Sequence, residues 1–218
     1  MTRAQAAVGE AFLADLDHTP VMAILRSSDG AGLVEPALAL FEAGIRLVEI
    51  SLTTPGACAA IEQIATRKPE HARIGAGTVL SAADVADVAA AGAQFVVTPA
   101  LADSVPESVH RGLPVAAGAL TPTEVLTAHR AGASIVKVFP ASLGGPAYLK
   151  ALRAPFPDIP LLAVGGVGIA DTAEYLRAGA RAVGIGSPLL VDAASGGDLL
   201  ALADRARRYL EAARMVHQ

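Results

Sequence analysis

One lysine lies in the middle of an apolar segment, AGASIVKVFP at residues 131–140. Ile-Val precedes Lys137 and Val-Phe follows it, so the pattern predicts a buried strand, where an unpaired charge is costly or loses its proton. Chance placement explains little, because the chain has only three lysines, at positions 68, 137 and 150. A desolvated lysine has its pKa lowered from about 10.4, and its free amine can form a Schiff base with a carbonyl. Lys137 is therefore a candidate nucleophile.

A glutamate occupies a comparable place. Glu49 is the one charged residue of the apolar segment LVEIS at residues 47–51. Schiff-base chemistry needs a group that moves protons, and a carboxyl group can do this. The alternative is that Lys137 and Glu49 form a buried ion pair that only fixes the interior. Such pairs are expensive and can usually be replaced by apolar groups, so the sequence favours amine catalysis.

Two glycine-rich segments could hold an anion. AVGGVG at residues 163–168 and GIGS at 184–187 each end an apolar segment and precede a helical one. Glycines let the backbone approach an anion while N–H groups point at it, which favours a phosphate site. The alternative is that they serve only tight turns. The candidate phosphate contacts are Gly165, Gly166, Gly186 and Ser187.

Three other features of the sequence do not indicate a dinucleotide site, a metal site or a disulfide. GAGTV at residues 75–79 lacks the third glycine of a dinucleotide-binding fingerprint. None of the five histidines ends a predicted strand, and no set of His, Asp, Glu or Cys has metal-ligand spacing, so we expect no metal. Cys58 is the only cysteine, which rules out an internal disulfide and suits a reducing cytoplasm.

The elements that position these residues recur along the chain. Ala-Gly followed by an apolar segment appears at residues 43, 91, 131 and 178, each time after an alanine-rich amphipathic stretch. The repeated unit is therefore a helix, a glycine cap and a buried strand. Extended over the chain, it predicts strands at 21–25, 46–51, 72–78, 95–98, 114–117, 135–139, 161–165 and 182–186. Helices are expected at 31–43, 55–67, 81–91, 102–111, 122–131, 146–154, 170–178 and 198–214.

Eight strands alternating with helices predict an α/β protein with a (β/α)8 TIM barrel. An open doubly wound sheet is the alternative. We expect one domain over residues 1–218, with an extra N-terminal helix at about 3–16. Strand alternation points Lys137 and Glu49 into the barrel. They lie on the sixth and second strands, opposite each other, so they should face one another across the mouth.

The charge pattern limits the partners. The net charge is −4 and charged residues are interspersed, so we expect neither nucleic acid nor a membrane surface as a partner. No apolar run reaches the length of a membrane span. Acidic residues interrupt the N-terminal segment, which therefore does not resemble a secretory signal. These features predict a cytoplasmic protein.

Several phrases together resemble one family across about residues 20–212. They are AILR at 23–26, VEISL at 48–52, IGAGTVL at 74–80, AGAQFVVTP at 91–99, VKVFPAS at 136–142 and AVGGV at 163–167. The chain resembles the small class I aldolases that act on 2-keto-3-deoxy-6-phospho sugar acids. These comprise the 2-keto-3-deoxy-6-phosphogluconate/4-hydroxy-2-oxoglutarate aldolases and the 6-phosphogalactonate aldolases.

The resemblance implies a role for each candidate residue. It implies Lys137 as the Schiff-base lysine and Glu49 as the general acid/base. It places Thr78 and Pro99 beside the pyruvate half of the substrate, and Phe139 close to the glycine-rich phosphate site. It also implies a homotrimer and a reaction without a metal or organic cofactor.

The chain departs from the gluconate branch of the family at one position. That branch usually has an arginine four residues after the catalytic glutamate, where this chain has Thr53. Arg26, at the end of the first strand, is expected to hold the substrate carboxylate instead. Together with Val164 and GGPAYLKAL at residues 144–152, this looks more like the galactonate branch.

The expected reaction is cleavage of a 2-keto-3-deoxy-6-phospho sugar acid to pyruvate and D-glyceraldehyde 3-phosphate. Two alternatives remain open. A phosphosugar isomerase or epimerase could use Glu49 as base and form no covalent adduct. A non-catalytic barrel that binds phosphorylated metabolites could keep the Lys–Glu pair for structure alone.

Overall fold

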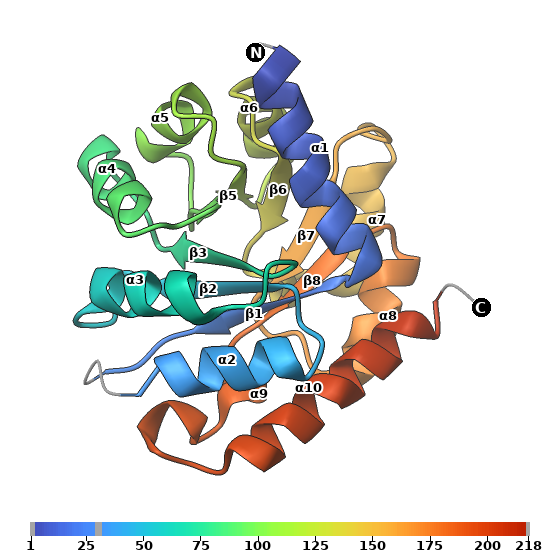
Figure 1. The fold of residues 1–218 in the computed structure, drawn as a ribbon. Helices are drawn as coiled ribbons and strands as arrows, with labels where there is room; N and C mark the ends of the chain where they lie inside the picture. The colour runs from blue at the N-terminus through green and yellow to red at the C-terminus, as the bar shows by residue number, and fades with distance from the viewer. Residues whose placement is uncertain (1–2, 29–31, 217–218) are drawn as a thin grey trace.

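The computed structural model describes residues 3–28 and 32–216. Eight parallel strands form a closed barrel, in which each strand pairs with the next and β8 pairs with β1 (Figure 1). The (β/α)8 barrel is thus confirmed, and the open doubly wound sheet is wrong. The strands are β1 Val21–Leu25, β2 Leu47–Ser51, β3 Arg73–Gly77, β4 Val96–Val97, β5 Val115–Ala119, β6 Ile135–Val138, β7 Leu161–Val164 and β8 Ala182–Ile185.

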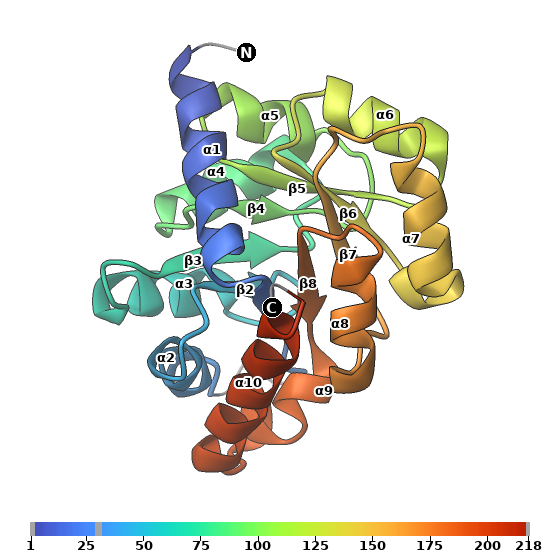
Figure 2. The same cartoon turned by 90° about the vertical axis from the view of Figure 1, so that its right-hand side faces the viewer.

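Helices surround the barrel in the expected order. They are α1 Arg3–His18, α2 Val34–Glu42, α3 Ala57–Arg67, α4 Ala82–Ala90, α5 Ser104–His110, α6 Pro122–Arg130, α7 Gly145–Arg153, α8 Ile169–Arg177, α9 Ser187–Leu190 and α10 Leu199–Arg214. Observed strand ends lie within two residues of the predicted ones and helix ends within three. The predicted start of one helix, at residue 31, lies outside the described residues. α10 lies between α2 and α8 and completes the ring of helices (Figure 2).

Three short helical segments were not predicted. They are α9 and two 3-10 turns, η1 Ala141–Leu143 and η2 Ala193–Ser195, which follow β6 and β8. Such segments are too short to show a helical period in the sequence. All three lie in loops at the carboxyl ends of strands, where the functional residues of this fold are found.

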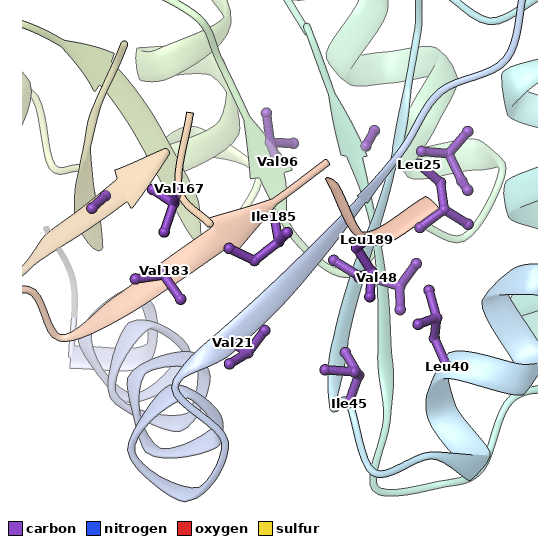
Figure 3. Packing of buried hydrophobic residues seen from close by; sticks show 14 of the residues in the cluster. Val21, Leu25, Leu40, Ile45, Val48, Val96, Val167, Val183, Ile185 and Leu189 are labelled. Atoms are coloured by element: carbon purple, nitrogen blue, oxygen red, sulfur yellow. The ribbon is translucent and has the colours of Figure 1, made fainter. Parts of the chain in front are cut away.

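The core has two layers, as strand alternation predicts. Val48, Ile50, Val136 and Val138 point outward and pack against the helices, in the cluster that Figure 3 shows around β1, β2 and β8. The barrel interior holds a separate cluster that includes Leu47, Phe95, Ile135 and Leu162. Large aliphatic residues thus fill both sides of the strands, as expected for a parallel sheet covered on both faces.

The extra N-terminal helix belongs to the inner layer. Phe12 and Leu16 of α1 are fully buried among the interior side chains, and the rings of Phe12 and Phe95 lie 5.3 Å apart between centroids. Asp15 of α1 forms ion pairs with Arg46, which precedes β2, and with Arg73, the first residue of β3. α1 therefore closes the amino end of the barrel and leaves the carboxyl end open.

None of the helices in the described ranges combines the length and apolar composition needed to cross a bilayer.

Candidate active site at the mouth of the barrel

A cavity of about 620 Å³ opens at the carboxyl ends of the strands. Every site residue expected from the sequence lines it: Arg26, Glu49, Thr78, Pro99, Lys137, Phe139, Gly165, Gly166, Gly186 and Ser187. These residues come from the ends of seven strands, or from the loops that follow, and extend from Arg26 to Ser187. The closure of the barrel brings them together.

Lys137 lies in β6, in register with Gly118 of β5 and Leu162 of β7. Its side chain is buried to 6% exposure, and Nζ lies 4.9 Å from the centre of the Phe139 ring. Burial lowers the pKa of Lys137, and the nearby charge of Glu49 opposes this shift only in part. The ammonium form is thus disfavoured, which makes the free amine more available as a nucleophile.

Glu49 lies in β2 and is 2% exposed. Burial raises its pKa from 4.5 to about 7, and the positive charge of Lys137 lowers it by less. Among the described residues, no hydrogen-bond partner reaches its buried Oε2. Gly77 of the neighbouring strand makes room for the carboxyl group, because a Cβ at that position would overlap Glu49 Oε1. Glu49 can therefore both give up and take a proton near neutral pH.

Lys137 and Glu49 face the same cavity without a direct ion pair. Within residues 3–28 and 32–216, the ion pairs all involve arginine, and neither of these two side chains takes part. Each still shifts the pKa of the other through its charge. A buried pair that only fixed the interior would be expected to close at hydrogen-bond distance, so the open arrangement suits proton transfer to a bound substrate.

A group of hydroxyl side chains lies next to Glu49. Ser51 Oγ lies 2.8 Å from Thr78 Oγ1 and 2.9 Å from Thr53 Oγ1. Ser51 also lines the cavity, although the sequence did not mark it as a site residue. The available signal was its place two residues after Glu49, on the same face of the strand. Thr78 has a positive φ of 59°, which is uncommon for a β-branched residue.

Pro99 reaches the cavity because the loop after β4 crosses closely over β5. Thr98 Oγ1 accepts a hydrogen bond from the Gly118 N–H and donates one to the Ala100 carbonyl. A Cβ at Gly118 would overlap the carbonyl of Pro99. Gly118 is thus required for this close approach of two backbones.

The glycine-rich segments form the opposite wall. Gly165 and Gly166 have φ values of 93° and 75°, which favour glycine. Gly186 precedes α9, and Ser187 is the first residue of that helix. Phe139, 38% exposed, contacts this wall, since a Cβ at Gly165 would lie 3.1 Å from its ring. Backbone N–H groups beside glycines form a suitable site for an anion.

Arg26 follows β1. This strand lies between β2, which carries the hydroxyl side chain of Ser51, and β8, which leads into the glycine-rich wall. Arg26 is exposed and lines the cavity. In the described part of the chain, its guanidinium forms no ion pair with a carboxylate. Arg26 is therefore placed to bind an anionic group of a ligand.

The loop after β8 supplies wall residues that sequence reasoning missed: Pro188, Leu190, Val191, Ala194 and Ser195. They belong to α9, η2 and the turn between them, which were not predicted. The described residues contain no group of three or more His, Cys, Asp or Glu side chains that could hold a metal ion.

Comparison with known proteins assigns this architecture to a family. Residues 13–201 match the family described as KDPG and KHG aldolase. A 2-dehydro-3-deoxy-6-phosphogalactonate aldolase from Escherichia coli is 40% identical over 172 residues, covering 78% of this chain and 84% of that protein. A 2-dehydro-3-deoxy-phosphogluconate aldolase from Pseudomonas aeruginosa is also 40% identical, over 72% of this chain and 70% of the other.

Solved structures agree with the sequence comparisons. A native KDPGal structure is 36% identical, has a TM-score of 0.85, and covers 91% of this chain and 96% of its own. The KDPG aldolase from Legionella pneumophila, with pyruvate captured as a covalent carbinolamine intermediate, is 28% identical with a TM-score of 0.83. It covers 93% of this chain and 98% of its own. The chain belongs to the KDPG and KHG aldolase family.

Proposed function

We propose that this protein is a class I aldolase that cleaves a 2-keto-3-deoxy-6-phospho sugar acid to pyruvate and D-glyceraldehyde 3-phosphate. The observation that carries the proposal is the placement of Lys137 and Glu49. A buried amine with a lowered pKa and a buried carboxyl with a pKa of about 7 line one cavity. Family membership supports the same chemistry.

The first stage forms a Schiff base. The neutral amine of Lys137 attacks C2 of the keto acid, and the carbonyl oxygen takes up a proton to give a carbinolamine. Glu49 then donates a proton to the leaving hydroxyl group, and water departs. The product is an iminium ion between Lys137 Nζ and C2, which can accept the electron pair released by carbon–carbon cleavage.

The second stage breaks the C3–C4 bond. Glu49, now a carboxylate, removes the proton of the C4 hydroxyl directly or through a water. The C3–C4 electron pair moves to the iminium nitrogen as D-glyceraldehyde 3-phosphate leaves, and an enamine remains. Glu49 returns the proton to C3, and water hydrolyses the iminium to release pyruvate and the free lysine.

The remaining wall residues are proposed to hold the two ends of the substrate. Arg26 binds the carboxylate, while Thr78 and Pro99 contact the pyruvate half. Phe139 lies near the phosphate, which is bound by Gly165, Gly166, Gly186 and Ser187. This division is supported by the placement of the hydroxyl side chains at the ends of β2 and β3 and of the glycines after β7 and before α9.

The substrates are proposed to include the epimer with the galactonate configuration at C4. Val164 is 3% exposed and lines the cavity next to Gly165. An apolar wall discriminates between hydroxyl orientations by only about 1–3 kcal/mol. We therefore expect activity on the galactonate epimer at least comparable to that on the gluconate epimer.

Reduction of the covalent intermediate tests the function. Borohydride in the presence of pyruvate should add one reduced pyruvyl unit at Lys137, seen by intact mass and peptide mapping. Lys137→Ala should abolish both the adduct and the cleavage of either epimer. Lys68→Ala is the matched control, because burial also lowers the pKa of Lys68, but its amine donates to the Ala72 carbonyl away from the cavity.

The alternatives predict other results. An isomerase or a binding protein would form no adduct, and an adduct that maps to Lys68 or Lys150 would contradict the assignment of Lys137.

A further inference from the structure

Three hydroxyl groups form a hydrogen-bonded chain along one wall of the cavity. Ser51 is its centre, bonded to Thr78 on one side and Thr53 on the other. Ser51 is 4% exposed, Thr53 is exposed, and Ser51 and Thr78 line the cavity. This row of hydroxyl groups thus leads from solvent, through a buried serine, to the cavity that Lys137 and Glu49 also line.

Ser51 is hydrogen-bonded to Thr78, a residue with an unusual backbone conformation. Thr78 has a φ of 59°, which costs a β-branched residue backbone strain. Ser51 lies in register with Gly77, and the Leu52 N–H donates to the Gly77 carbonyl at 2.8 Å, so the backbone before Thr78 is fixed. Within the described ranges, the bond to Ser51 is the side-chain hydrogen bond that orients the Thr78 hydroxyl.

The number of hydroxyl protons determines how many hydrogen bonds these three side chains can donate to a ligand. Each hydroxyl has one proton, and two hydrogen bonds among three hydroxyls use two of them. One proton is left to donate outside the chain. An anion in the cavity favours the arrangement in which Thr53 donates to Ser51 and Ser51 donates to Thr78, because the free proton then lies on Thr78. Such a chain strengthens its terminal donor cooperatively.

We propose that Ser51 is a positioning residue that directs the Thr78 hydroxyl as a donor to the carboxylate of the 2-keto acid. The inference rests on the proposed function. Arg26 supplies the charge for the carboxylate, while the hydroxyl chain supplies a directed donor. Ser51 acts through Thr78 and does not itself contact the reacting atoms.

Exchange of the pyruvate methyl protons with deuterium tests this role, because it measures binding and enamine formation without the second product. Ser51→Ala should raise KM for pyruvate about tenfold, as expected for losing an oriented hydrogen bond to a charged group, and change kcat less than threefold. Inhibition of cleavage by inorganic phosphate reports the glycine wall and should stay within twofold of wild type. Ser51→Thr keeps a hydroxyl and should restore KM.

A double-mutant cycle separates a positioning role from a structural one. If Ser51 acts through Thr78, the double variant with Thr78→Ala should have the same KM as Thr78→Ala alone. Ser108→Ala is the matched control, since Ser108 is equally buried and its hydroxyl donates to the Ser104 carbonyl in α5. This control should leave KM unchanged.

Several outcomes would overturn the inference. A KM for pyruvate in Ser51→Ala equal to that of the wild type would do so. Equal weakening of pyruvate binding and of phosphate inhibition would also do so, as would additive effects of the two substitutions on KM. If circular dichroism shows that Ser51→Ala does not fold, Thr53→Ala decides. In Thr53→Ala, a KM increase of about threefold supports the role of the hydrogen-bonded hydroxyl groups, and an unchanged KM contradicts it. No pyruvate adduct on the wild-type protein would instead overturn the proposed function, and this inference with it.

Discussion

Glu49 combines deep burial with a carboxyl group that titrates near neutrality. Its desolvation is only partly offset by Lys137, so its pKa rises to about 7. Glu49 must be protonated to expel water from the carbinolamine, and that proton transfer leaves it ionised for the removal of the C4 proton. The same shift affects stability, since the folded protein keeps a proton that the unfolded chain loses above about pH 4.5.

The raised pKa of Glu49 makes both activity and stability depend on pH. Since the reaction starts from a neutral Lys137 and a protonated Glu49, the kcat/KM of the wild type should decline as pH rises above an apparent pKa near 7. Glu49→Gln should remove this decline and lower kcat by about 10²–10⁴-fold. Because the folded-state pKa is raised, the free energy of unfolding should fall as pH increases from about 4.5 to 7, by up to about 3 kcal/mol. Glu49→Gln should abolish this fall, as measured by urea unfolding across that pH range.

Glu62→Gln provides the control, because Glu62 is an exposed residue of α3. It should keep the wild-type dependence of both activity and stability on pH. Persistence of the wild-type stability slope in Glu49→Gln would show that another group causes it.

The site residues differ in how readily the sequence reveals them. Lys137 and Glu49 could be predicted because each is a charge in an otherwise apolar strand. Ser51 could not, because serine is common at strand ends and its role depends on how closely the next loop approaches. The positive φ of Thr78 was equally hidden, since threonine rarely adopts it.

Among the elements, α1 has the clearest role that its sequence did not show. The amphipathic pattern predicted a helix at about residues 3–16, but not where it would pack. In the structure, Phe12 and Leu16 fill the interior at the amino end of the barrel. The strands contribute both the ring of Phe95 and the small side chains of Ala116 and Ala182 to this cluster, and the ring of Phe12 packs among them.

Removing that ring should destabilise the barrel without changing its chemistry. Phe12→Ala should lower the free energy of unfolding by about 3–5 kcal/mol, because it leaves a cavity among fully buried side chains. Borohydride trapping of pyruvate at Lys137 should remain at wild-type stoichiometry at low temperature, since the site lies at the other end. Val8→Ala, on the half-exposed side of α1, should change stability by less than about 0.5 kcal/mol. Loss of trapping in a folded Phe12→Ala would show that α1 also supports the site.

Element boundaries followed from glycine caps and apolar runs, whereas α9 and the 3-10 turns did not. Pro188 lies at the start of α9 and Val191 at its end, with only one turn of helix between them. A segment this short takes its conformation from tertiary contacts, such as the bonds that Arg205 of α10 donates to the carbonyls of Leu189 and Leu190. A local pattern cannot contain that information.

At the scale of the whole molecule, the repeated helix–glycine–strand unit was enough to predict a barrel, and barrel closure alone gathered the site. Two expectations stay predictions: one domain over residues 1–218, and a cytoplasmic location. The assembly is a third. We propose the homotrimer that the family resemblance implies.

The exposed apolar surface gives this proposal a physical basis. Large apolar side chains are exposed at several places, among them Leu80 at 48%, Leu143 at 71% and Leu200 at 82%. Single exposed leucines are ordinary on a monomer, but exposing their apolar surface to water costs free energy, and burial in a subunit interface would remove that cost. Sedimentation velocity at micromolar concentration should therefore give three times the 22.0 kDa mass of one chain. Aspartate introduced separately at Leu80, Leu143 and Leu200 should lower that mass at the position, or positions, that lie in the interface. A monomeric wild type at these concentrations would contradict the trimer, and a trimer unaffected by all three substitutions would place the interface on other surfaces of the barrel.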